Sequence, residues 1–125
     1  MRILLDTHVF CWWYYEPERL SQRAFRTVKE AEEVFVSSAS VWEIAIKARL
    51  GKIKADAQEL FDQIEINDFQ ELPVSSRHTI LVANLPLHHT DPFDRLLIAQ
   101  AISEPLHLIT ADPQLGQYSE LVIKV

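Results

Sequence analysis

The sequence predicts one α/β domain over residues 1–125, with a parallel sheet flanked by helices in a three-layer α/β/α arrangement. Short apolar runs of strand type alternate with segments of helical periodicity along the chain. The runs "ILL", "VFV" and "LHLIT" are apolar at nearly every position, as strands buried on both faces are. A length of 125 residues, 48% of them apolar, suits a single globular domain.

The first half of the chain predicts two strands and four helices. Ser21 is a suitable N-cap for a helix with apolar positions at Ala24, Phe25 and Val28. Gly51 is a suitable residue to end a helix, because glycine readily adopts the left-handed conformation found just beyond many helix ends. We expect strands at 2–6 and 34–38, and helices at 7–16, 21–33, 38–51 and 56–65.

The second half predicts three further strands and two helices. Pro73 ends a short strand, and Ser75 or Ser76 caps the helix that follows. Asp91 and Pro92 have the order of an N-cap followed by proline at the first helical position. We expect strands at 69–74, 106–110 and 120–125, and helices at 75–85 and 91–103.

Composition excludes several classes of protein. Cys11 is the only cysteine, so neither an intramolecular disulfide nor a cysteine-based zinc site is expected. Two glycines cannot form a glycine-rich phosphate loop. Asp6 interrupts the apolar start, and no apolar run approaches the roughly 20 residues that span a bilayer, so we expect a cytoplasmic protein. The formal net charge of -6 counts against a nucleic-acid substrate unless a local basic patch is present.

Four acidic side chains lie near predicted strand ends or helix starts. Ligands of open parallel sheets bind beyond the carboxyl ends of the strands. Asp6 ends the first strand, and Asp112 follows "LHLIT". Glu43 is about two turns into the helix after the second strand, and Asp94 is in the first turn of its helix. We therefore ask whether these four carboxylates converge.

Each acid also has a purely structural interpretation. Asp91 and Asp112 precede prolines and would cap helices, and Asp94 at the third helical position would favour the helix dipole. Glu43 and Lys47 are spaced i, i+4, as in a surface ion pair. Asp6 fits this interpretation least well, because a carboxylate after a buried strand must shift its pKa or find a cation.

Four motifs together resemble those of the PIN-domain ribonucleases, specifically the VapC-type toxins of toxin–antitoxin pairs. The resemblance extends from Arg2 to about Asp112. The motifs occur in the expected order on the expected elements, and they are "LLDTH", "SSASVWEIAIKARLGK", "DPFDRLLIAQA" and "LITAD".

The resemblance implies an endoribonuclease that uses Mg²⁺ or Mn²⁺ to cut RNA. It further implies a homodimer, and an antitoxin protein whose tail blocks the acidic pocket. The family's acidic quartet falls on Asp6, Glu43, Asp94 and Asp112. Asp91 matches no position of the quartet and is expected to cap its helix and support the site.

Carboxylates suit the chemistry that the resemblance implies, because Asp and Glu oxygens are hard ligands for Mg²⁺. Asp6 and Asp94 are the expected direct ligands, and Asp112 is expected to bind directly or through water. Glu43 could ligate the metal or act as the base toward metal-bound water. One ion or two would be compatible with these residues.

The remaining polar residues leave alternatives open. Thr7 could orient Asp6, touch a phosphate or cap a helix. Lys47 and Arg95 are candidate phosphate contacts. A rim of Lys47, Arg49, Lys52 and Lys54 could bind RNA, or could be a solvated helix end.

The aromatic and histidine residues are harder to assign. Residues 12–15, "WWYY", cannot all face one core, so some are expected to contact the antitoxin or a second subunit, although they could also cover the edge of a small domain. His88 and His89 show no recognised ligand spacing and are interpreted as loop residues. Two rival functions are a phospho-receiver signalling domain and a PIN-like binding module without catalysis.

Overall fold

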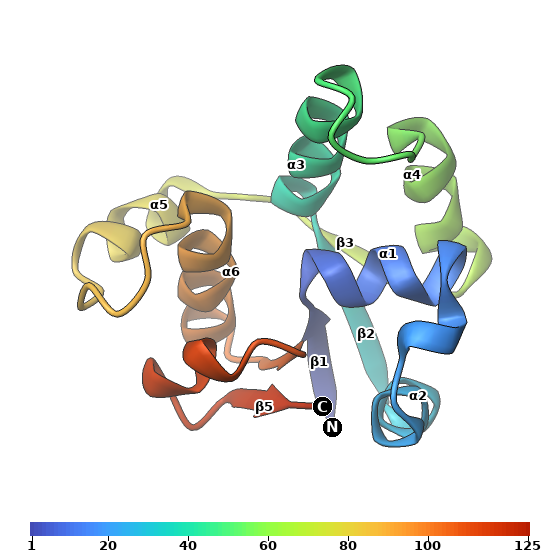
Figure 1. Ribbon diagram of the computed structural model, residues 1–125. Coiled ribbons are helices and arrows are strands. Elements are labelled where there is room, and N and C mark those ends of the chain that lie inside the picture. The colour runs from blue at the N-terminus through green and yellow to red at the C-terminus, as the bar shows by residue number, and fades with distance from the viewer.

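A computed structural model describes residues 1–125 and contains one five-stranded sheet (Figure 1). The sheet lies between two layers of helices, which confirms the predicted α/β/α class. The strands are β1 (Arg2–Leu5), β2 (Glu33–Ser37), β3 (Gln70–Leu72), β4 (His107–Thr110) and β5 (Val122–Lys124). The helices are α1 (Thr7–Tyr15), α2 (Gln22–Glu30), α3 (Ser38–Arg49), α4 (Ala57–Ile66), α5 (Ser76–Ala83) and α6 (Pro92–Ser103), with 3-10 helices η1 (Pro17–Arg19) and η2 (Pro113–Gln117).

All the strand pairs are parallel, and the strand order is β3-β2-β1-β4-β5. Strand β1 is therefore central, with Leu4 opposite Phe35 of β2 and Leu108 of β4. Parallel pairing brings the carboxyl ends of all five strands to the same edge of the sheet. The segments that follow β1, β2 and β4 consequently start next to one another.

Alternation along the strands divides the apolar core into two parts. Ile3 and Leu5 pack in one cluster with residues of α1, α2, α3 and α4. Leu4 points to the opposite face, where Leu97 and Ile98 of α6 cover it. Both faces of the central strand are fully buried, which is why its sequence is apolar at consecutive positions.

Most predicted helix starts are confirmed by their caps, whereas the helix predicted over 21–33 ends at Glu30, because β2 begins at Glu33. The Oγ of Ser21 accepts from the N–H of Ala24, and the Oδ1 of Asp91 accepts from the N–H of Asp94. Gly51 has a φ of 72°, the left-handed conformation expected of a residue that ends a helix. The two 3-10 helices were not predicted as helices, although Asp112 does cap η2, as its following proline suggests. No helix combines the length and apolar character needed to cross a membrane.

The buried face of α3 differs from the apolar face that helical spacing predicts, which consists of Val41, Ile44, Ala45 and Ala48. Ala45 is exposed, whereas Ser40 and Glu43 are buried. The helix starts directly after β2, so its first turns lie beside the start of α1 at the carboxyl edge. There the Oγ of Ser40 accepts a hydrogen bond of 2.8 Å from Thr7 Oγ1. In this part of α3, the buried residues are therefore those that make polar contacts at the carboxyl edge, and not those of the predicted apolar face.

Candidate active site at the carboxyl edge of the sheet

Asp6 lies at the centre of the edge because it directly follows β1. Its Oδ1 accepts from the N–H of His8 at 3.1 Å, which caps α1. Its Oδ2 accepts from Thr110 Oγ1, at the end of the neighbouring β4, at 2.5 Å. Burial raises the pKa of Asp6 above its ordinary value, and these hydrogen bonds oppose that change only partly. Asp6 is thus a buried carboxyl group that two fixed donors hold in one orientation.

Glu43 enters the site from the second turn of α3. Its side chain is only 4% exposed, and its Oε2 accepts from Lys47 Nζ at 2.6 Å. This hydrogen bond raises the pKa of Lys47 and so keeps the ammonium charged. The pair has the predicted i, i+4 spacing, but the burial of Glu43 excludes an ordinary surface pair. Glu43 Oε1 is buried and has no hydrogen-bond partner.

Asp94 lies in the first turn of α6, where Asp91 caps the helix. Asp94 Oδ2 is 2.9 Å from Nε2 of His89. The pKa of Asp94 rises from 3.8 to about 6, first because the side chain is buried and then because of the charges on Asp6 and Asp91. The capping interpretation of Asp91 is confirmed, and its charge also acts on the ionisation of Asp94.

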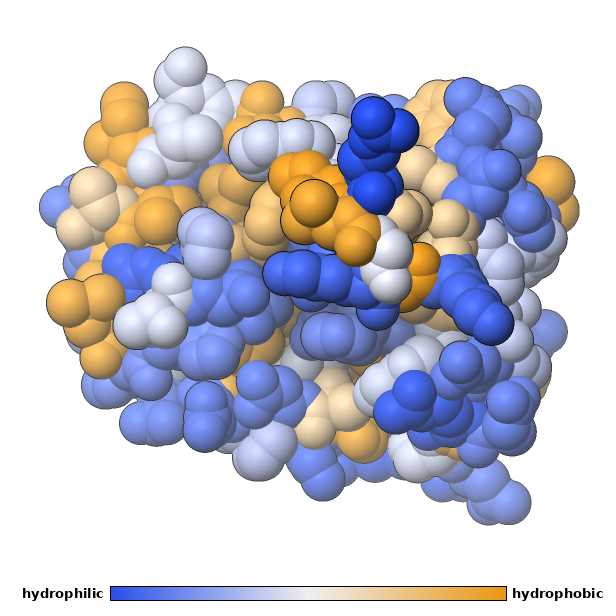
Figure 2. Space-filling view, turned by 45° about the horizontal axis from the view of Figure 1, so that its top comes forward, coloured by the Kyte–Doolittle hydropathy of each residue, from blue (hydrophilic) through white to orange (hydrophobic).

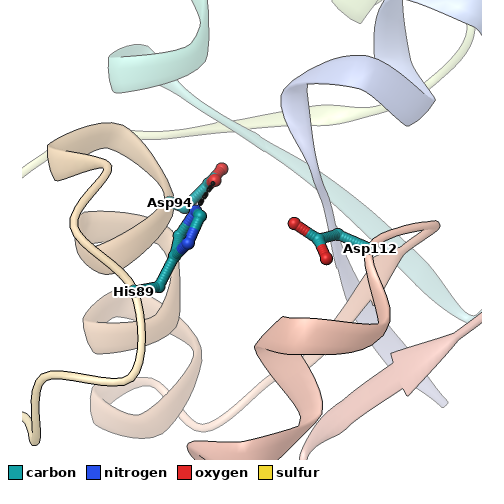
Figure 3. Close-up of side chains that lie close together, drawn as sticks. All are labelled: His89, Asp94 and Asp112. Atoms are coloured by element: carbon teal, nitrogen blue, oxygen red, sulfur yellow. Dashed lines mark hydrogen bonds and ion pairs between the residues drawn. The ribbon is translucent and has the colours of Figure 1, made fainter.

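Asp112 comes to the same edge from the far side of β1. It follows β4, and its Oδ1 accepts from the N–H of Gln114 at 2.9 Å, which starts η2. Its own N–H donates to Thr110 Oγ1 at 3.0 Å. One ligand atom from each of His89, Asp94 and Asp112 lies within 4.8 Å of the other two (Figure 3).

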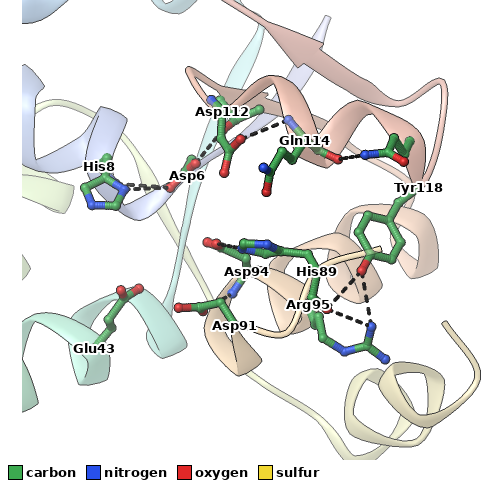
Figure 4. Close-up of polar contacts among 12 residues, drawn as sticks. Asp6, His8, Glu43, His89, Asp91, Asp94, Arg95, Asp112, Gln114 and Tyr118 are labelled. Carbon is green, nitrogen blue, oxygen red and sulfur yellow. Dashed lines mark hydrogen bonds and ion pairs between the residues drawn. The ribbon is translucent and has the colours of Figure 1, made fainter. Parts of the chain in front are cut away.

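The structure brings the four predicted acids together around one space. Figure 4 shows Asp6, Glu43, Asp94 and Asp112 directed toward one another from four separate segments of the chain. The charges of Asp6 and Glu43 both contribute to the raised pKa of Asp94, as expected of close neighbours. A cavity of about 700 Å³ extends from this cluster along α1, and its polar lining includes Asp6, Thr7, His8, Glu43, Lys47, Lys54, Arg19 and Asp112.

The other predicted polar residues have different surroundings. Thr7 lines the cavity, but its hydroxyl donates to Ser40 and does not bond to Asp6. Lys47 and Lys54 line the cavity, whereas Arg49 and Lys52 are exposed outside it.

Arg95 does not have the predicted position of a phosphate contact. It is only 8% exposed, and its guanidinium points away from the acids (Figure 4). There it donates to Tyr118 Oη and to backbone carbonyl oxygens, which belong to Val82, Leu85, Pro86 and His89. Arg95 therefore holds the segment between α5 and α6, because its donors are used within the fold.

Two residues of the site were missed by the sequence analysis. His89 was interpreted as a loop residue, yet its ring faces Asp94. Thr110, which orients both Asp6 and the backbone of Asp112, received no role. The available signals were a histidine five positions before Asp94 and a hydroxyl at the end of an apolar strand. Neither signal identifies its partner without the fold.

The aromatic run is divided between the cavity and the packing of the helices. Trp12 and Tyr15 line the cavity, and the guanidinium of Arg19 lies 4.6 Å from the centre of the Trp12 ring. Trp13 instead stacks on Phe25 of α2 at 5.1 Å. Figure 2, which brings the carboxyl edge of the sheet forward, shows strongly hydrophilic and hydrophobic side chains side by side on this face.

Comparison with known proteins decides the family. The sequence pattern of the PIN domain matches residues 3–121. The chain belongs to the PIN-domain family. This PIN domain is 32% identical to Ribonuclease VapC22 of Mycobacterium tuberculosis over 122 residues, which are 93% of this chain and 91% of the relative. The resemblance drawn from the four motifs is thereby confirmed.

Solved structures share the fold of this PIN domain. VapBC2 from Rickettsia felis, crystallised with a DNA fragment from its promoter, superposes with a TM-score of 0.71 at 18% identity, covering 100% of this chain and 98% of that one. A toxin–antitoxin complex from Klebsiella pneumoniae gives 0.68 at 14% identity, covering 98% and 96%. At such identities the likeness shows the architecture alone.

The donor set of the PIN domain fits a divalent cation. Carboxylate oxygens predominate, and hard divalent cations prefer oxygen ligands. Lys47 pairs with Oε2 of Glu43, but the buried Oε1 of the same carboxylate has no hydrogen-bond partner in the protein, so this oxygen is available to a cation.

Proposed function

We propose that this PIN domain is a metal-dependent endoribonuclease and the toxin of a type II toxin–antitoxin pair. The observation that carries the proposal is the convergence of four acids around one space, where Glu43 Oε1 is buried without a partner. The relative named as a ribonuclease and the solved toxin–antitoxin complexes support it.

Asp6, Asp94 and Asp112 are proposed to hold Mg²⁺ or Mn²⁺, with Glu43 as a further ligand or as the base that takes a proton from the attacking water. A bound ion would supply charge neutralisation at the phosphate and a water of lowered pKa. Thr110 keeps Asp6 oriented by its hydrogen bond. Lys47 holds Glu43 in position, because its ammonium lies 2.6 Å from the carboxylate.

RNA is proposed to reach the acids along the cavity. Arg19, Lys47 and Lys54 provide positive charge for phosphates, and Trp12 and Tyr15 provide flat surfaces near the acids. Cationic grooves with aromatic side chains are typical of proteins that bind single-stranded nucleic acids. These three cations would give RNA a route along a cavity that also holds acids, in a protein whose formal net charge is -6.

We also propose a cognate antitoxin, a homodimer and a cytoplasmic location. The antitoxin would inhibit by covering the acidic cavity.

The homodimer needs apolar surface that a second subunit can cover. Trp42 is 60% exposed and lies 5.3 Å from the ring of Phe93, so this pair is apolar surface available to a second subunit. Light scattering on the isolated chain would test the homodimer, and light scattering on the chain co-expressed with a candidate antitoxin would test the complex.

The two rival functions have less support than a metal-dependent ribonuclease. A phospho-receiver domain needs paired acids at the end of the first strand, but Asp6 is a single acid there, between Leu5 and Thr7. A binding module without catalysis would not require four acids directed toward one another. Metal-dependent phosphorylation of one aspartate, without cleavage of RNA, would favour the receiver.

The decisive experiment compares the wild type with Asp94→Asn. Expression of the wild type should arrest growth, and the purified protein with Mn²⁺ should cleave tRNA, rRNA or mRNA. Both effects should be lost in Asp94→Asn and kept in Glu65→Gln, a control that removes an exposed carboxylate elsewhere. Intact RNA after incubation with the wild type and Mn²⁺ would favour the binding module.

A further inference from the structure

His89 is held at the acidic site by its own backbone. It lies in the segment between α5 and α6, and its carbonyl oxygen accepts from Arg95 Nη1 at 3.4 Å and from Tyr118 Oη at 3.2 Å. Arg95 is buried and also donates to the carbonyl oxygens of Leu85 and Pro86 in the same segment and to that of Val82 at the end of α5. A buried guanidinium thus fixes the position from which the His89 ring extends.

The ring of His89 faces carboxylates, whereas that of the adjacent histidine does not. His89 Nε2 is 2.9 Å from Asp94 Oδ2, and Asp112 is the third member of the same compact group (Figure 3). His88 is exposed, and its ring packs against Tyr118 at 5.1 Å. The two neighbouring histidines therefore provide a test residue and a matched control.

We propose that Nε2 of His89 is a ligand of the divalent ion at this site, an inference that rests on the proposed metal-dependent function. Neutral imidazole is the commonest nitrogen ligand of metals in proteins. The 2.9 Å between His89 Nε2 and Asp94 Oδ2 matches two adjacent ligand atoms of an octahedral site, which are about 3 Å apart when the bonds are about 2.1 Å.

A second observation points to a cation at the same place. Glu43 is 3% exposed, and its Oε1 has no partner although its charge acts on Asp94. Glu43 lies outside the compact group of His89, Asp94 and Asp112, but its charge acts on Asp94, so a positive ion held by that group would also attract this carboxylate. The hydrogen bond between His89 and Asp94 would then be replaced by a bond from each residue to the metal.

A nitrogen ligand changes which metal the site prefers. Mg²⁺ binds through oxygens and water and gains little from imidazole. First-row transition ions accept nitrogen readily, and their affinities for mixed sites rise from Mn²⁺ onward. The site therefore discriminates in favour of Mn²⁺ and against Mg²⁺, and His89 is the residue that produces the discrimination.

Pulsed electron paramagnetic resonance of Mn²⁺ bound to the full chain tests the ligand directly. Wild type and His88→Gln should show modulation from a coordinated ¹⁴N, which changes when histidine is labelled with ¹⁵N. His89→Gln should lose the modulation. Its dissociation constant for Mn²⁺ should rise by about tenfold or more, while that for Mg²⁺ changes by less than about threefold.

A purely electrostatic role for His89 would give other results. If the imidazole only neutralises Asp94, Mn²⁺ in the wild type shows no nitrogen coupling, and His89→Gln changes the binding of both ions equally. That outcome overturns the inference. His89→Asp offers a second variant in case His89→Gln does not fold, and it should bind Mg²⁺ at least as well as the wild type while showing no nitrogen signal.

The same experiment separates this inference from the proposed function. Mn²⁺ that binds without nitrogen coupling, in a protein that cleaves RNA, refutes the role of His89 and leaves the nuclease intact. Nitrogen coupling that depends on His89 supports the inference whether or not an RNA target is known. If wild type and Asp94→Asn both fail to bind Mn²⁺, the inference and the metal-dependent function fail together.

Discussion

Replacing Asp94 by asparagine should stabilise the metal-free protein at neutral pH. Asp94 is held close to other carboxylates, and its side chain is 18% exposed. Its pKa of about 6 lies above the 3.8 of an ordinary aspartate, so ionisation of this residue is more costly in the folded chain than in the unfolded one. Asparagine has nearly the same shape and carries no charge.

The size and sign of the effect follow from linkage. A pKa raised by about two pH units corresponds to about 3 kcal/mol of folding free energy. Because the folded pKa is the higher one, this stability is present below the unfolded pKa of about 3.8 and is lost as the pH rises through about 6. The uncharged amide of the variant avoids that loss, but weakens the hydrogen bond with His89 by about 1 kcal/mol. We expect a net gain of about 2 kcal/mol at pH 7.5.

Urea unfolding in the presence of EDTA, at several pH values between 4.5 and 7.5, measures this difference. The gap between Asp94→Asn and the wild type should shrink as the pH falls, and Glu65→Gln, which removes an exposed acid, should show little gap at any pH. Mn²⁺ at 100 times its dissociation constant should stabilise the wild type by about 2.7 kcal/mol and the variant far less. An Asp94→Asn protein that is less stable at pH 7.5, or a gap independent of pH, would refute the reasoning.

Three further predictions follow from named contacts. Thr110→Val removes the hydrogen bond to Asp6 and should weaken Mn²⁺ binding by about tenfold, measured by titration calorimetry, with little change in the circular dichroism spectrum. Arg95→Lys cannot satisfy the carbonyl groups that the guanidinium binds and should lower the free energy of unfolding by about 2 kcal/mol in urea, whereas a mere phosphate contact would leave it unchanged. Lys54→Gln should lower the salt dependence of RNA binding more than Lys52→Gln does, because Lys54 lines the cavity; equal slopes would contradict the proposed path.

Much of the fold could be read from local signals. Gly51 ends α3 in the left-handed conformation that its identity predicts, and Ser21 and Asp91 cap the helices that they precede. These features depend on a few consecutive residues, so the sequence alone is enough to predict them. The burial of Glu43 and the exposure of Ala45 depend instead on where α3 lies relative to the strand ends, which no periodicity along α3 expresses.

In the candidate site, too, some features could be predicted from the sequence and others could not. The four acids could be proposed as site residues because each lies within a recognisable motif. Their supporting contacts could not, since Thr110 and Asp6 are 104 residues apart and meet only because β4 pairs with β1. Arg95 adjoins Asp94 in sequence, yet on a helix adjacent side chains point in different directions, about 100° apart. Sequence proximity to an acid therefore misled the interpretation of Arg95.

Capping and metal binding, which the sequence presents as competing interpretations of the acids, are compatible in the structure. Asp112 uses Oδ1 to start η2, and Asp6 uses Oδ1 to start α1. A carboxylate has about four lone-pair sites, so a cap occupies one and leaves the others for a cation. The cap also fixes the rotamer, because the backbone N–H that it binds cannot move without unwinding the helix. At the edge of this sheet, capping is therefore the means by which Asp6 and Asp112 are fixed in position before any metal binds, whereas Asp94 and Glu43 are placed by the helices on which they lie.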